Sequence, residues 1–95
     1  MAAYFFVNVD VKDPERYAEY IRSAPSSIAR YGGKYLVRGG TAQKMEGSYE
    51  PKRVVILEFE TLERARQWWA SEEYRAPKAL RQSTAVTDMI LVQGI

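Results

Sequence analysis

The sequence predicts an α+β fold in which strands and helices follow the order β-α-β-β-α-β, the ferredoxin-like arrangement. Segments rich in aromatic and β-branched residues recur along the chain. Two apolar stripes with helical spacing separate the first strand from the second and the third from the fourth. Right-handed crossovers then give one antiparallel sheet in the order 4-1-3-2. With 95 residues, the chain is expected to form a single domain, 1–95.

The first half of the chain contains a strand, a long helix and a short strand. Residues 3–11 alternate between a wholly apolar face and one that becomes polar toward its end, as expected for a strand. The helix begins at Asp13-Pro14, where the carboxylate can cap it and proline suits the first helical position. Pro25 lies inside it, so a kink or break is expected there. The pair Gly32-Gly33 ends it, and a strand over 35–39 follows.

A polar linker leads from this strand to the third predicted strand, residues 53–59. Because the linker has no helical stripe, the two strands should form an antiparallel hairpin. Thr61 then caps a second helix, and Trp68 lies on the flank of its stripe. The stripe consists of Leu62, Ala65 and Trp69.

The chain beyond the second helix is predicted to be broken into short pieces. Ser71 resembles a fresh cap followed by a turn, and Pro77 keeps the next segment from continuing smoothly. Residues 79–81 are expected to form another short helical turn. Residues 88–93 read as the last strand.

The composition excludes several kinds of site. The chain has no cysteine and no histidine, so no disulfide or thiolate nucleophile is possible and the commonest metal and haem ligands are missing. No glycine loop precedes a helix to cradle a phosphate. We therefore expect no metal, haem or flavin cofactor. The net charge of +2 and the lack of a long apolar segment predict a cytoplasmic protein without nucleic-acid or membrane partners.

The central strands are apolar on both faces, at residues 5–7 and 54–57. In this fold both helices cover the same face of the sheet, and a half-exposed antiparallel strand should alternate. Leaving several such side chains in water forgoes roughly 1.5–3 kcal/mol each. The bare face therefore predicts a homodimer joined through the sheet. The pattern leaves open whether the side that carries Val55 faces the partner.

Several motifs, taken together, resemble the domain of unknown function 1330 family. They are the run Tyr31–Gly40, Asp13-Pro14-Glu15, Glu58-Phe59 and Ser71-x-Glu73-Tyr74. The resemblance implies a dimeric α/β barrel in which two ferredoxin-like sheets face each other, and it implies no established activity. The wider superfamily includes cofactor-independent monooxygenases, small isomerases and lyases, and haem enzymes. This chain differs from the haem relatives that have a histidine ligand, because it contains no histidine.

Strand directions place several polar and aromatic residues at one end of the predicted sheet. We predict a ligand cavity between sheet and helices, with Arg38 as the polar anchor and Asn8 and Tyr74 as hydrogen-bonding groups. The aromatic wall would be Trp69, and Tyr17 lies at the start of the first helix.

Each candidate also has a structural interpretation. Arg38 could pair with a carboxylate such as Glu50 or cap a loop carbonyl, and Tyr74 could satisfy a backbone carbonyl. Trp69 could simply pack in the core. Asn8 could bond the loop before the first helix. Glu58 is expected to be a structural partner of Lys34 or a tyrosine.

Two functions fit the sequence equally well. One is a cofactor-independent enzyme, monooxygenase- or isomerase-like, acting on a small organic molecule. Its acid–base chemistry would fall to tyrosine, a carboxylate or the substrate. The other is a non-catalytic ligand-binding or stress-related dimer. An RNA-recognition module shares the element order, but aliphatic residues stand where its stacking aromatics should be, in residues 53–59.

Overall fold

A computed structural model of the protein describes residues 1–95 and confirms the predicted fold class. The first and third strands have the predicted bounds. A third helix is present that was not predicted as such. The elements are β1 (Ala3–Val11), α1 (Pro14–Arg30), β2 (Lys34–Arg38), β3 (Arg53–Phe59), α2 (Leu62–Trp69), α3 (Glu72–Thr84) and β4 (Ala85–Gln93).

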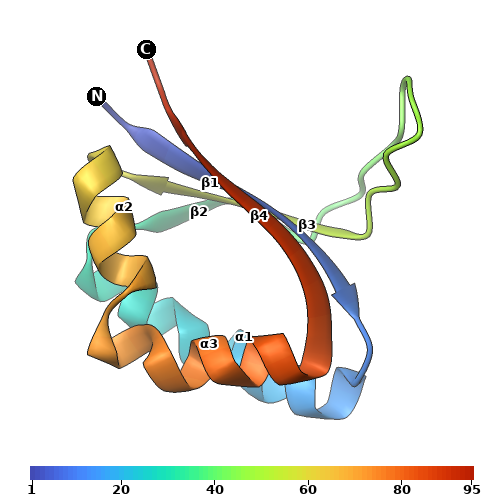
Figure 1. Ribbon diagram of the computed structural model, residues 1–95, viewed down its shortest axis with the longest axis horizontal. Coiled ribbons are helices and arrows are strands. Elements are labelled where there is room, and N and C mark those ends of the chain that lie inside the picture. Colours follow the sequence, from blue (N-terminus) through green and yellow to red (C-terminus); the bar gives the residue numbers. More distant parts are fainter.

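The four strands form one antiparallel sheet in the order β2-β3-β1-β4, which read from the β4 edge is the predicted order. All helices lie on one side of the curved sheet, and α1 and α3 run side by side (Figure 1). The connection between β2 and β3 extends away from the rest of the molecule. No helix is long and apolar enough to cross a bilayer.

The chain does not break at either of its two internal prolines. Helix α1 continues through Pro25, and α3 is one continuous helix of 13 residues through Pro77. The Ser71 side chain accepts a hydrogen bond from the Tyr74 N–H and caps α3 as predicted. A proline removes only one helix hydrogen bond, and packing of α1 against α3 outweighs this loss. The last strand consequently starts at Ala85, three residues before the predicted Asp88.

The two adjacent tryptophans have opposite roles from those predicted. Trp68 is fully buried against Phe5 and Phe59, whereas Trp69 is 40% exposed and stacks under the Lys78 ammonium group. Neighbouring helix positions differ by about 100° in direction, so only one of the pair can face the core. Trp68 takes that place because its indole N–H can donate to the buried Ser27 hydroxyl, 3.1 Å away.

Glu58 is the structural partner that the sequence predicts. Its carboxylate lies 3.1 Å from the Lys34 ammonium group across the β2–β3 pair. Hydrogen bonds from Lys34 and from the Tyr4 hydroxyl lower the pKa of Glu58. The pair ties the edge strand β2 to the centre of the sheet.

Candidate functional site

A partly enclosed cavity lies between the sheet and the helices, and 11 of its 14 lining residues are hydrophobic. Its free space is about 30 Å³, enough for water-sized molecules only. Two of its walls, Arg81 and Met89, also line an open groove of about 560 Å³ between α2, α3 and β4. The polar and aromatic lining residues include Tyr17, Tyr20, Tyr35, Arg38, Arg53 and Arg81.

A β-bulge turns Arg38 toward this cavity. Tyr35 pairs with Leu57 and Arg38 pairs with Val55, so between the two pairs β2 advances one residue more than β3. The irregularity lies between Tyr35 and Val37, and such a bulge re-aims the side chains that follow it. Leu57 and Val55 both line the cavity. Arg38 and Tyr35 therefore face the helices together, and Val55 does not lie on the bare face.

Arg38 spans the gap between β2 and α1. Its Nη2 donates to the backbone carbonyl of Ile21 at 3.1 Å, and its guanidinium lies over the Tyr35 ring at 4.6 Å. No carboxylate pairs with it. The expected alternative partner, Glu50, pairs with Lys44. The carbonyl that Arg38 caps belongs to a helix and not, as predicted, to a loop.

Arg53 approaches the cavity from the first residue of β3. It points to the same side as Val55 and Leu57 because side chains alternate along a strand. Its Nε is buried and has no hydrogen-bond partner. Gly39 makes room for it, since a Cβ there would collide with the guanidinium group, and the Gly39 φ of 72° favours glycine as well.

Arg81 is the most deeply buried charge of the site, with 5% of its surface exposed. Its Nε donates to the Tyr74 hydroxyl at 3.3 Å, and that hydroxyl is 2.6 Å from the Tyr20 hydroxyl. Burial, followed by the neighbouring Tyr74 hydroxyl, raises the pKa of Tyr20 strongly. Burial also raises the pKa of Tyr17. These phenols therefore stay neutral at physiological pH and can donate hydrogen bonds.

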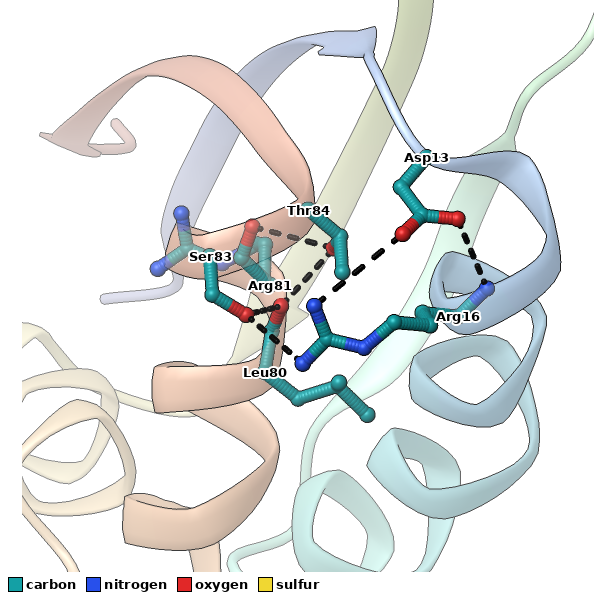
Figure 2. Close-up of polar contacts among 6 residues, drawn as sticks. All are labelled: Asp13, Arg16, Leu80, Arg81, Ser83 and Thr84. Atoms are coloured by element: carbon teal, nitrogen blue, oxygen red, sulfur yellow. Dashed lines mark hydrogen bonds and ion pairs between the residues drawn. The ribbon is translucent and has the colours of Figure 1, made fainter.

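A polar cluster fixes the helix turn that carries Arg81 (Figure 2). The Thr84 carbonyl accepts from the backbone N–H groups of Lys12 and Asp13 at 2.8 and 3.0 Å. Arg16 reaches from the first turn of α1 to the Ser83 hydroxyl at 3.4 Å. The end of α3 is thus held against the start of α1, the helix that carries the cavity tyrosines.

The structure separates the five predicted site residues. Arg38 and Tyr17 line the cavity, and Tyr74 lies directly behind Tyr20. Trp69 lines only the outer groove. Asn8 faces the other side of the sheet, where it donates to the Glu50 carbonyl at 3.2 Å and accepts from the Lys52 N–H at 2.7 Å. It therefore ties down the segment before β3 and not the loop before α1.

Sequence reasoning missed four lining residues, Tyr20, Tyr35, Arg53 and Arg81. The signal for Arg53 was its position two residues before Val55, on the same face of the strand. Arg81 lies seven residues, or two helical turns, after Tyr74. That spacing places Arg81 on the same side as Tyr74 only if α3 is one continuous helix. None of the ion pairs in the structure includes Arg38, Arg53 or Arg81.

Comparison with known proteins places the chain among proteins of this fold. The family described as "Domain of unknown function (DUF1330)" matches residues 2–95. No curated protein sequence matches significantly. The RPA0582 protein of unknown function from Rhodopseudomonas palustris has a similar structure, with a TM-score of 0.80 and 20% identity. The alignment covers 99% of this chain and 82% of that one.

More distant structures share the fold at lower identity. SnoaB from Streptomyces nogalater, described as a cofactor-independent oxygenase, has a TM-score of 0.65 and 10% identity over 99% of this chain and 93% of its own. A dimeric ferredoxin-like protein of unknown function from Thermobifida fusca has a TM-score of 0.60 and 9% identity, with coverage of 99% and 92%. At these identities the likeness concerns the fold alone.

Proposed function

The chain belongs to the DUF1330 family, and from the arginines around its cavity we propose that it is a homodimer that binds a small organic anion between sheet and helices. The observation that carries this proposal is Arg81, a residue that is 5% exposed and takes part in no ion pair. Burying an uncompensated charge costs several kcal/mol. An anion in the cavity would recover that cost. Arg38 and Arg53, likewise without acidic partners, add positive charge to the same site.

The shape of the site suggests how such a ligand would lie. The partly enclosed cavity, with free space of about 30 Å³, suits the charged group alone. Met89 separates it from the outer groove, and the flexible methionine side chain can move without strain. The apolar part of the ligand would then extend past Met89 into the groove, against Phe5 and Leu91.

Benzoate and its neutral isostere benzamide test this proposal. Benzoate at about 100 times its Kd should raise the free energy of unfolding by about 2.7 kcal/mol, and Tm by about 10–20 °C. Benzamide should have no effect, because it has the same ring but no charge for the arginines. Differential scanning calorimetry at constant ionic strength measures both. Equal shifts with the two compounds, or none with either, would contradict anion binding.

The homodimer is supported by the face of the sheet opposite the helices. Ile90, Phe6 and Ile56 lie in register across three adjacent strands of that face. Phe6 is 44% and Ile90 60% exposed, which is unusual for neighbouring large apolar side chains. We propose a second copy as the occupant of this face, and the description of two structural neighbours of the same fold as dimeric supports this proposal.

A second candidate is a cofactor-independent enzyme acting on the same class of anion. The hydrogen-bonded chain from Arg81 through Tyr74 to Tyr20 favours it, since it places a polarised, neutral phenol at the cavity wall. No carboxylate lines the cavity, so the substrate itself must be acidic. In an enolisation, the carbon would lose its proton to a water molecule, which returns it to the enolate oxygen, and Tyr20 would donate a hydrogen bond to that oxygen as its charge develops.

Phenylpyruvate tests the catalytic candidate, because it is an aromatic carboxylate with an acidic methylene group. Enol formation, followed by ultraviolet absorbance, should exceed the uncatalysed rate. Oxygen uptake distinguishes an oxygenase from an isomerase. Tyr20→Phe should lower the rate about a hundredfold while benzoate still binds. If phenylpyruvate binds but neither enolises nor consumes oxygen faster than in buffer, the protein is a binding protein.

A further inference from the structure

We propose that Pro25 is a positioning residue of the anion site: by leaving the Ile21 carbonyl without its helix partner, it provides the acceptor that holds Arg38 at the cavity. This inference rests on the proposed function of the same cavity. It explains why a proline stands in the interior of α1, where it weakens the helix.

The backbone of α1 provides the first step. In an α-helix the carbonyl of each residue accepts from the N–H four positions later. The partner position of Ile21 is Pro25, which has no N–H. The Ile21 carbonyl therefore lacks its regular helix bond, and an acceptor in that state needs another donor.

Arg38 supplies that donor. Its Nη2 lies 3.1 Å from the Ile21 oxygen, and its guanidinium group rests on Tyr35 at 4.6 Å. Two contacts thus fix a long side chain that is otherwise exposed to solvent. An arginine side chain that is already ordered loses less conformational entropy when it binds an anion. The remaining N–H groups of the guanidinium stay available to the cavity that Arg38 lines.

The chain contains a matched control for this effect. Pro77 lies inside α3 as Pro25 lies inside α1, and it removes the helix partner of the Glu73 carbonyl. No side chain donates to that carbonyl, and neither Pro77 nor Glu73 lines the cavity. Pro25→Ala and Pro77→Ala therefore make the same chemical change in two helices, and only the first affects the acceptor of Arg38.

The experiment measures benzoate affinity by isothermal titration calorimetry. Pro25→Ala should weaken binding about fivefold, the factor for one ordinary hydrogen bond, because the backbone N–H restored at position 25 competes for the Ile21 carbonyl. Pro77→Ala should leave Kd within about twofold. In an Arg38→Met background, Pro25→Ala should have no further effect, which a purely structural role of the proline would not produce.

A measurement without ligand makes the inference testable even if benzoate does not bind. Rotation of the Arg38 guanidinium, followed by NMR of its Nη hydrogens, should be slow in the wild type and in Pro77→Ala, and fast in Pro25→Ala. Equal rotation rates in all three proteins would overturn the positioning role. So would equal losses of affinity in the two proline variants. Absence of benzoate binding in the wild type, with slow Arg38 rotation, would instead contradict the proposed function alone.

Discussion

Replacement of Arg81 by methionine is expected to abolish benzoate binding and, at the same time, to stabilise the free protein. Methionine fills a similar volume and removes the charge of a residue that is 5% exposed and has no acidic partner. Replacing buried ion pairs by apolar residues of similar volume is often neutral or stabilising by about 1–4 kcal/mol, and an arginine without an acidic partner has no ion pair to lose. The lost bond from Arg81 Nε to the Tyr74 hydroxyl offsets part of this gain, and Tyr20 remains as a partner for that hydroxyl. Thermal unfolding and calorimetric titration measure the two effects.

The control is Arg75→Met on the same helix, where the guanidinium is exposed and pairs with Glu72 on the surface. It should change neither Tm nor benzoate affinity noticeably. A large loss of stability in Arg81→Met would show that the folded protein already compensates this charge. Anion binding would then lose its main support.

Replacement of Ile56 by lysine is expected to dissociate the proposed homodimer while each subunit keeps its fold. Ile56 lies beside Phe6 in the centre of the bare face, so a dimer joined there would bury an unpaired ammonium group. A penalty of about 3 kcal/mol weakens the dimer by at least a hundredfold. Light scattering coupled to size exclusion at micromolar concentration should show a dimer for the wild type and a monomer for the variant.

Ala79→Lys provides the same added charge on α3, on the helix side of the molecule and away from the bare face. It should remain dimeric. A wild-type monomer, or an Ile56→Lys protein that stays dimeric, would rule out assembly through the bare face. Circular dichroism of the variant checks that loss of the dimer does not reflect unfolding.

Local signals in the sequence were sufficient for most of the fold. The Asp13 cap, the end of α1 before the Gly32-Gly33 pair and the bounds of β1 and β3 depend on neighbouring residues only, and the structure confirms them. The continuity of α3 could not be predicted this way. Proline at position 77 signals a break locally, whereas the packing of α3 against α1 that outweighs it involves residues far away in the sequence.

The candidate site was predicted less completely, for a related reason. Arg38 and Tyr17 were identified because their strand and helix were correctly placed. Asn8 was assigned to the wrong face, since a strand end gives no indication of which side of the sheet the helices cover. The bulge before Arg38 reverses side-chain direction without any glycine or proline to mark it. The position of Arg81 beside Tyr74 could not be predicted, because it requires a continuous α3 and the sequence predicted an interruption at Pro77.

The attachment of the β2–β3 connection by Asn8 has a consequence for how the chain can vary among relatives. Both bonds of Asn8 hold the base of this segment, at Glu50 and Lys52, so the exposed residues before it make no contact with the cavity. Doubling the length of a flexible loop costs only about 0.6 kcal/mol. Insertions and deletions between residues 41 and 48 should therefore accumulate freely. The same segment is a suitable place for an affinity tag or a fluorescent label that leaves the cavity untouched.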